Sequence, residues 1–129
     1  MTNELDFIVI DDDPFNNKIC TLFLRKYFGD IAVKTFTEPE AALSFLAGHT
    51  PGTKQSIVLL DINMPTMSGW EFLDEYEHVD STIKNSLKIY ILSSSVDERD
   101  KERAEQNKNV VDYLIKPLTT DAVAKLLKN

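Results

Sequence analysis

The stretch Ser56–Leu73, SIVLLDINMPTMSGWEFL, decides the fold. It begins with aliphatic residues without polar alternation, which is typical of a strand covered on both faces in a parallel sheet. The run ends on a carboxylate, Asp61, and continues through a loop with Pro65 and Gly69 into a helix opened by Ser68. In open α/β sheets, ligands bind outside the carboxyl ends of strands. Asp61 therefore lies where we expect a functional site.

The bulk composition limits the kinds of protein that this chain can be. Its 129 residues, 43% hydrophobic and 27% charged, suffice for one core, so we expect a single domain over residues 1–129 with no output domain. The net charge of -7 argues against binding to nucleic acid or anionic lipid. No apolar run reaches the ~20 residues of a membrane span. Cys20 is the only cysteine, so we expect no internal disulfide and a cytoplasmic location.

Polar residues also follow three other predicted strands. They are Asp11 and Asp12 after Phe7–Ile10, Ser93 after Leu87–Leu92, and Lys116 after Val111–Ile115. Only the predicted strand Ile31–Phe36 lacks such a residue. Helical patterns alternate with the strands, which predicts a parallel sheet with right-handed crossovers. Because the carboxyl ends of such strands share one edge of the sheet, we expect three carboxylates, a hydroxyl and an ammonium group to converge there.

Helix capping explains part of the acidic run after the first strand. Asp13 has the position of an N-cap and Pro14 that of the first helical residue. Capping does not explain Asp11 and Asp12, which would repel each other without a cation. The helix that follows carries apolar residues with the spacing of one helical face. They are Phe15, Ile19, Leu22 and Phe23.

Two other segments have the spacing of a capping box, Thr37–Glu40 and Ser95–Glu98. The second box makes Ser95 the expected capping residue of the helix predicted from Asp97 to about Asn107. Ser93 closes the preceding strand directly, so its hydroxyl is the better candidate for contact with a ligand.

These motifs resemble the receiver domain of two-component response regulators over essentially the whole chain. They are Ile10–Pro14 (IDDDP), Leu60–Pro65 (LDINMP) with Ser68–Trp70 (SGW), Leu92–Ser94 (LSS) and Tyr113–Pro117 (YLIKP). The resemblance implies a flavodoxin-like, doubly wound (βα)5 fold, with a parallel sheet in the strand order 2-1-3-4-5. It also implies a monomer or a weak dimer.

The resemblance further implies a chemistry for the converging residues. Asp61 would receive a phosphoryl group from a sensor histidine kinase or a His-containing phosphotransfer protein. Mg²⁺ would be the cofactor, because a hard ion suits an all-oxygen site for phosphoryl transfer. Asp12, Asp61 and the backbone carbonyl of Asn63 would bind the metal directly, and Asp11 would bind it mostly through water. Lys116 and Ser93 would hold the phosphoryl oxygens.

In this family phosphorylation switches protein–protein interactions. Ser93 would move toward the phosphoryl group and Tyr113 would turn inward. A downstream protein, which the sequence does not identify, would bind the face formed by the helix Asp97–Asn107, the strand Val111–Ile115 and the last helix. Two features depart from the family: Ser93 replaces the usual Thr, and the segment 108–112 lacks the usual Gly-Ala turn.

Two alternatives stay open at this stage. A phosphatase of the haloacid-dehalogenase type also uses an Asp nucleophile at a strand end, but it needs a second acid two residues later. That position is Asn63, an amide with no proton to give at neutral pH. A pure interaction module that takes no phosphate is less supported, because Asp61 and Lys116 are both present.

Overall fold

The computed structural model describes residues 5–50 and 55–128, which form five strands and six helices. The strands are β1 (Leu5–Ile10), β2 (Ala32–Phe36), β3 (Gln55–Leu60), β4 (Leu87–Ser93) and β5 (Val110–Ile115). The helices are α1 (Pro14–Phe28), α2 (Pro39–Ala47), α3 (Gly69–Tyr76), α4 (Ser81–Lys84), α5 (Glu98–Gln106) and α6 (Thr120–Lys128). None of the described helices is long and apolar enough to cross a membrane.

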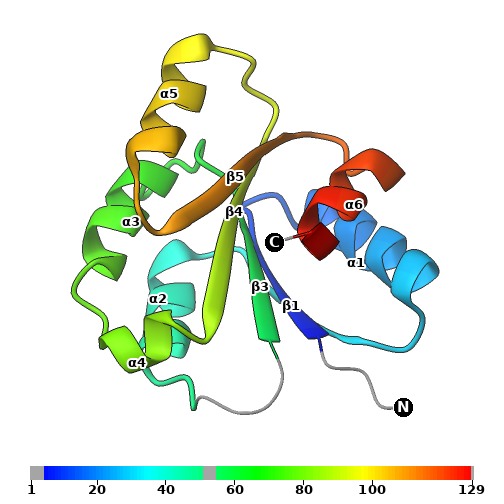
Figure 1. Ribbon diagram of the computed structural model, residues 1–129, viewed down its shortest axis with the longest axis horizontal. Helices are drawn as coiled ribbons and strands as arrows, with labels where there is room; N and C mark the ends of the chain where they lie inside the picture. The colour runs from blue at the N-terminus through cyan, green and yellow to red at the C-terminus, as the bar shows by residue number, and fades with distance from the viewer. Residues whose placement is uncertain (1–4, 51–54, 129) are drawn as a thin grey trace.

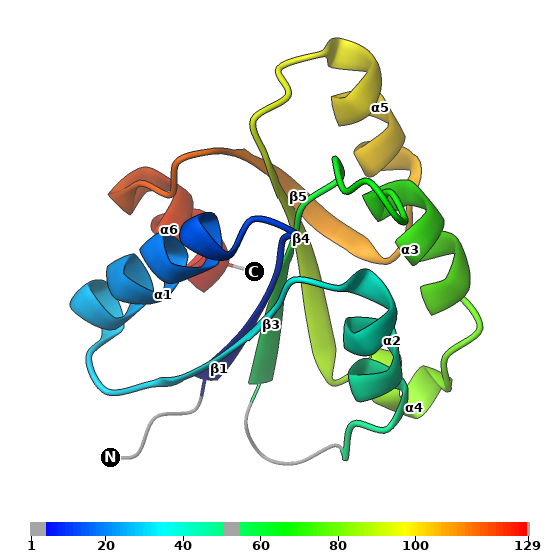
Figure 2. The same ribbon diagram turned by 180° about the vertical axis from the view of Figure 1, so that it is seen from behind.

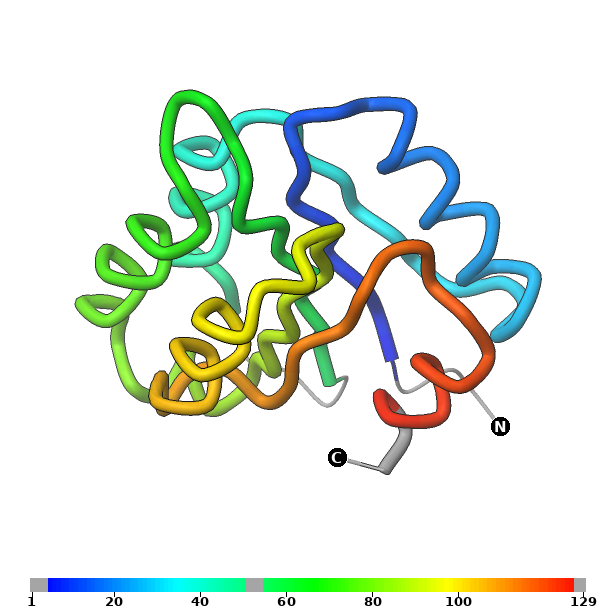
Figure 3. The backbone as a smooth tube through the Cα atoms, turned by 90° about the horizontal axis from the view of Figure 1, so that it is seen from above, coloured from blue at the N-terminus to red at the C-terminus, as the bar shows by residue number. Residues whose placement is uncertain are grey.

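The five strands form one parallel sheet in the order β2-β1-β3-β4-β5, which confirms the predicted flavodoxin-like topology. The register pairs the last residue of β1, Ile10, with the last residue of β3, Leu60. It also pairs Ser93 at the end of β4 with Ile115 at the end of β5. Figure 3 shows the molecule from above, the side on which the connections that follow these strands lie. The register therefore brings the candidate residues to one edge of the sheet.

Helices cover both faces of the sheet, as Figures 1 and 2 show from opposite sides. Successive residues of the central strands alternate between the two faces, because side chains of a strand point to opposite sides in turn. Phe7, Val9, Leu59 and Tyr90 pack in the core beneath α1 and α6. Ile8, Ile10, Leu60 and Ile91 pack in the core beneath α2, α3 and α5. Burial on both faces explains why these strands read as continuous aliphatic runs.

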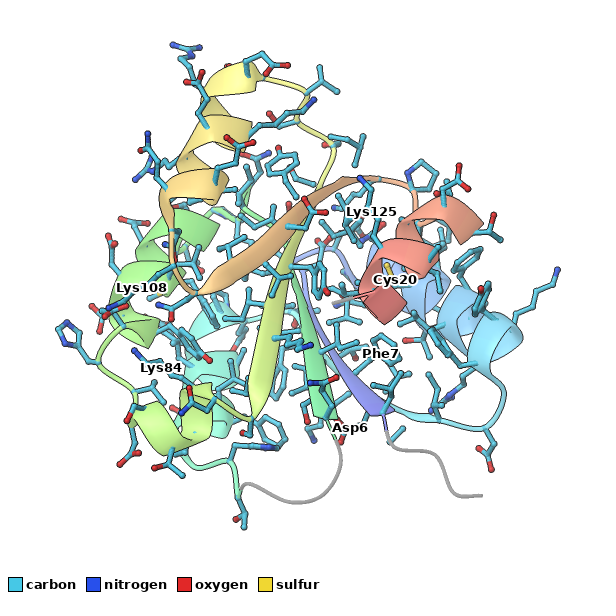
Figure 4. All side chains as sticks on the ribbon, in the orientation of Figure 1. Asp6, Phe7, Cys20, Lys84, Lys108 and Lys125 are labelled. Atoms are coloured by element: carbon cyan, nitrogen blue, oxygen red, sulfur yellow. The ribbon has the colours of Figure 1, made fainter. Side chains whose placement is uncertain are left out.

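The buried side of α1 differs from the predicted apolar face. Phe15, Ile19 and Leu22 are 69%, 43% and 61% exposed, and only Phe23 of the predicted set packs against the core. The helix instead buries one polar and two apolar residues: Asn17, Cys20 and Leu24. The Nδ2 of Asn17 donates to the carbonyl oxygens of Asp11 (2.9 Å) and Phe36 (3.2 Å), while its buried Oδ1 has no hydrogen-bond partner among the described residues. Cys20, labelled in Figure 4, belongs to the core shared with α6.

Two helix starts agree with the sequence. Asp13 caps α1 by accepting a hydrogen bond from the N–H of Phe15 at 3.0 Å, with Pro14 as the first helical residue. Ser68 opens α3 in a complete capping box with Glu71. The box fixes the direction in which the chain leaves the loop after Asp61.

Two other predicted caps are wrong, and one helix was not predicted. The N-cap of α2 is Glu38, which makes no side-chain capping hydrogen bond, so Thr37 does not cap this helix. The N-cap of α5 is Asp97, whose carboxylate accepts the N–H of Arg99, and Ser95 lies before the helix. The short helix α4 is one helix more than the five of a (βα)5 fold.

Candidate functional site

Backbone hydrogen bonds extend the sheet by one residue beyond the strands and position the candidate side chains. The N–H of Asp61 donates to the last carbonyl of β1 at 3.0 Å, and the N–H of Asp11 donates to the last carbonyl of β2 at 3.0 Å. The N–H of Lys116 donates to the last carbonyl of β4 at 2.8 Å. Residues distant in the sequence are thus held level at the edge of the sheet.

Three carboxylates converge at this edge, as the sequence predicted. Asp11, Asp12 and Asp61 each offer an oxygen, and these oxygens lie within 4.8 Å of one another. Asp11 is 2% exposed and Asp61 is 5% exposed, while Asp12 is partly exposed. Carboxylate oxygens are the ligands that hard divalent ions prefer. The cluster is consistent with the Mg²⁺ site of receiver domains.

Lys116 supplies a positive charge to the acidic cluster. Its Nζ lies 2.6 Å from Asp11 Oδ2 and 3.7 Å from Asp61 Oδ2, and the Lys116–Pro117 peptide bond is cis. Burial alone would lower the pKa of Lys116, but the hydrogen bond to Asp11 and the charge of Asp61 outweigh it and raise the pKa. Lys116 therefore keeps its proton and its positive charge within the site.

The pKa of Asp61 is raised. Burial is the main cause, and the negative charges of Asp11 and Asp12 add to it. Lys116 opposes the rise, as does the N–H of Asn63, which donates to Asp61 Oδ1 at 3.3 Å. The ionised carboxylate is thus held in an environment that disfavours its charge.

We expect Asp61→Asn to raise the free energy of unfolding at pH 7 in metal-free buffer, because it removes this disfavoured charge. The folded protein holds the protonated form of Asp61 more readily than the unfolded chain does. This preference contributes its full stability below the unfolded-state pKa of about 3.9. The stability from this preference is lost as the pH rises through the raised pKa of the folded state. The gain from Asp61→Asn should therefore shrink as the pH falls toward about 4. Urea unfolding at several pH values measures this difference, and a gain independent of pH would contradict the assignment.

Asp11 has two further hydrogen-bond donors, and one of them, the side chain of Asn16, was not among the predicted site residues. The backbone N–H of Asp13 donates to Asp11 Oδ1 at 2.9 Å. The side-chain Nδ2 of Asn16 donates to Asp11 Oδ2 at 2.7 Å, so Asn16 shares this oxygen with Lys116. The available signal was the position of Asn16 in the first turn of a helix whose N-terminus adjoins the acidic run.

The backbone of Ser95 links the two predicted switch residues. Ser93 is fully buried at the end of β4, and its Oγ accepts a hydrogen bond from the N–H of Ser95 at 3.1 Å. The hydroxyl of Tyr113, which is half-buried, donates to the carbonyl oxygen of Ser95 at 2.8 Å. A movement of Ser93 can therefore reach Tyr113 through one intervening residue.

The chain is similar to known proteins over nearly all of its length. A family model described as response regulator receiver domain matches residues 7–128. A response regulator receiver protein from Dyadobacter fermentans is 31% identical, with a TM-score of 0.88 over 96% of this chain and 95% of that one. A two-component response regulator from Cytophaga hutchinsonii is 32% identical, with a TM-score of 0.85 over 98% and 96% of the two chains.

A curated relative, a probable cyclic di-GMP phosphodiesterase from Vibrio cholerae, is 27% identical over 117 residues. That match covers 91% of this chain and 24% of the relative, so the chain spans about a quarter of that protein's length. Receiver domains are signalling modules that partner histidine kinases and are not classical enzymes, which sets aside the phosphatase alternative. Its fold, its acidic pocket and its match to the family model together assign this chain to the family of response regulator receiver domains.

Proposed function

We propose that Asp61 receives a phosphoryl group from a phosphohistidine of a sensor kinase or a phosphotransfer protein. The observation that carries the proposal is the burial of Asp61 among two carboxylates and one lysine, with Lys116 Nζ 3.7 Å from Asp61 Oδ2. An Asp61 oxygen would attack the phosphorus atom as the bond between phosphorus and the imidazole nitrogen breaks. The imidazole would leave with that electron pair and take up a proton. The product on this chain is an aspartyl phosphate.

The acidic cluster would hold Mg²⁺ during this reaction. We assign Asp11, Asp12, Asp61 and the backbone carbonyl of Asn63 as its protein ligands, in line with the oxygen-rich donor set. When bound, the ion neutralises charge on the transferring phosphoryl group. Its positive charge would also favour the ionised form of Asp61, which burial disfavours.

Lys116 and Ser93 would bind the transferred phosphoryl group. The long side chain of Lys116 already reaches toward Asp61, and its charge suits the phosphoryl oxygens. Ser93 closes the strand adjacent to β3 and carries a hydroxyl that can donate to an oxygen. The missing methyl of threonine does not affect that hydrogen bond.

The aspartyl phosphate would then change a binding surface formed by α5, β5 and α6. Phosphorylation adds charge of about -1.5 to -2 and new acceptor oxygens at Asp61. Ser93 moving toward them would release the N–H of Ser95 and shift the carbonyl that Tyr113 binds. The adjoining helix α5 is weakly anchored, since Ala104 is its only buried residue. A weakly anchored helix responds readily to such a change.

The test is intact-mass spectrometry after incubation with Mg²⁺ and a small phosphodonor such as acetyl phosphate. We expect the mass of one phosphoryl group to be added in the presence of Mg²⁺ and no addition in EDTA. Asp61→Asn should abolish the addition. Sustained hydrolysis of the donor without any phosphorylated protein at early times would instead favour an enzymatic activity.

We also propose that the phosphohistidine partner docks on the exposed side of α1, through the apolar stripe Phe15, Ile19 and Leu22. The helix begins two residues after Asp12, so the stripe starts beside the acidic cluster. A partner that covers the stripe would bring its phosphohistidine close to Asp61. Apolar side chains this exposed on one helix face are typical of a protein-binding surface.

We expect the double substitution Phe15→Ala and Leu22→Ala to slow transfer from a phosphohistidine protein at least about tenfold. Each of these side chains, when the partner covers it, would contribute about 1.5–3 kcal/mol to the free energy of docking. Phosphorylation by acetyl phosphate should not change. The phosphoryl donors in this assay are phosphotransfer proteins and kinases encoded in the same genome as this chain. Phe45→Ala is the control, because Phe45 is 38% exposed but lies on α2, which packs on the other face of the sheet. Equal slowing with both donors would contradict a docking role.

A further inference from the structure

Three donors hold the Asp11 carboxylate, and two of them share one oxygen. Oδ1 accepts the backbone N–H of Asp13 at 2.9 Å. Oδ2 accepts Lys116 Nζ at 2.6 Å and Asn16 Nδ2 at 2.7 Å. The residue is only 2% exposed, so bulk water has little access to replace a lost donor. An unsatisfied buried carboxylate oxygen is costly, which makes the identity of these donors important.

Phosphorylation creates a conflict over Lys116. The single ammonium group that binds Asp11 Oδ2 is also the group that we assign to the phosphoryl oxygens on Asp61. Its distances of 2.6 Å to Asp11 and 3.7 Å to Asp61 show that Asp11 holds it before phosphorylation. When Lys116 turns toward the phosphoryl group, Asn16 is the hydrogen-bond donor that remains on Asp11 Oδ2, beside the Mg²⁺ that Asp11 would help to hold.

We propose that Asn16 is a positioning residue that keeps Asp11 hydrogen-bonded and in place when Lys116 moves to the phosphoryl group. The inference rests on the proposed function and adds a role for a residue outside the phosphoryl- and metal-binding set. Asn16 lies in the first turn of α1, so the fixed helix end sets the position of its amide. Its Nδ2 also lies 3.8 Å from Cys20 Sγ, one helical turn away, which orients the amide toward Asp11.

The chemistry of an amide suits this position. Its N–H is a donor at every accessible pH and carries no net charge. A lysine or arginine there would add positive charge beside a cation site, and an acid would add a further negative charge to the Asp11, Asp12 and Asp61 cluster. An alanine would leave Asp11 Oδ2 without a protein donor once Lys116 has moved.

The adjacent asparagine provides a matched comparison. Asn17 Nδ2 donates to the backbone carbonyls of Asp11 at 2.9 Å and Phe36 at 3.2 Å. Asn17 therefore ties the ends of β1 and β2 to α1 through backbone oxygens, whereas Asn16 binds the Asp11 carboxylate. Removing the Asn17 amide should therefore lower the stability of the fold. Removing the Asn16 amide should instead weaken ligand binding at the acidic cluster.

The test measures two affinities on the full chain. One is for Mg²⁺ alone, by calorimetry, and the other is for fluoroberyllate in saturating Mg²⁺, by fluorine NMR, because fluoroberyllate mimics the phosphoryl group on an aspartate. Asn16→Ala should weaken fluoroberyllate binding about tenfold, the loss expected for a hydrogen bond to a charged group. Mg²⁺ binding alone should weaken by less than about threefold, because Lys116 still holds Asp11 in that state. Asn16→Ser, checked by circular dichroism, repeats the measurement if the alanine variant misfolds.

Asn17→Ala should lower the urea midpoint and change both affinities by the same factor. Equal changes in the two affinities for Asn16→Ala, or no change, would overturn the positioning role while the proposed function stands. Wild-type protein that binds no fluoroberyllate in saturating Mg²⁺ would overturn the proposed function, and this inference with it.

Discussion

Lys116→Ala is expected to slow phosphorylation of Asp61 by acetyl phosphate about a hundredfold, while Mg²⁺ binds as tightly as before or more tightly. The slowing follows from the loss of the cation that would stabilise the phosphoryl oxygens in the transition state. The metal should not bind less well, because Lys116 Nζ occupies Asp11 Oδ2 at 2.6 Å and repels a second cation. Some phosphorylation should persist, since the nucleophile is intact, but it should no longer change partner binding.

The two readouts are the initial phosphorylation rate by intact mass and the Mg²⁺ dissociation constant by calorimetry. Lys108→Ala is the control, because Lys108 is 75% exposed and pairs with Glu77, away from the acidic cluster. That variant should match the wild type in both measurements. A parallel loss of Mg²⁺ affinity in Lys116→Ala would mean that the lysine supports the site only structurally.

Gly69→Ala should lower the free energy of unfolding by about 3 kcal/mol, the range of severe overpacking. A Cβ at Gly69 would lie 2.7 Å from Ile62 Cα and 2.8 Å from the carbonyl oxygen of Asp61. Both are backbone atoms of the segment that presents the Asp61 carboxylate, and Gly69 N donates to the carbonyl of Ile62 at 3.0 Å. The added methyl group must push α3 away from this segment or displace Asp61. We therefore expect slower phosphorylation as well as lower stability.

Gly48→Ala is the matched control for this substitution. A Cβ at Gly48 would lie 3.6 Å from the Ser44 carbonyl oxygen, an ordinary contact, and the φ of -98° suits any residue. Its effect should stay within about 0.5 kcal/mol of zero or be slightly stabilising. Urea unfolding of both variants measures the contrast. Similar effects at the two glycines would show that the close approach at Gly69 has no special cost.

The sequence predicted the sheet and the convergence at its edge because both depend on strong, local signals. Continuous aliphatic runs mark strands buried on two faces, and the polar residues directly after them mark the strand ends. Asp11, Asp12, Asp61 and Lys116 meet as expected from that rule. Their roles in phosphoryl transfer stay proposals.

Tertiary contacts decide which face of α1 is buried, a question that residue spacing leaves open. Helical spacing showed that Phe15, Ile19 and Leu22 share a face, but it does not show which face of α1 meets the sheet. Asn17 helps to determine the buried face, because its Nδ2 donates to two carbonyl oxygens at strand ends. A hydropathy pattern places a polar residue such as Asn17 on the exposed side of a helix.

Competing local hydrogen bonds explain why Ser95 is not the N-cap of α5. The Ser95 hydroxyl accepts the N–H of Asp97 at 3.3 Å and donates to Asp100 Oδ2 at 2.6 Å, so it forms a turn just before α5. Asp97 then caps the helix in its place. Asx and serine turns of this kind use the same residues as a capping box, so spacing alone does not separate them.

Mapping the phosphorylated residue in the wild-type protein tests the role of Asp61 directly. Borohydride reduction converts an aspartyl phosphate to homoserine, which tandem mass spectrometry locates in a peptide. After treatment with acetyl phosphate and Mg²⁺, we expect conversion at Asp61 and at no other aspartate. Conversion at Asp11 or Asp12, or none at Asp61 in a protein that has gained phosphate, would contradict this role.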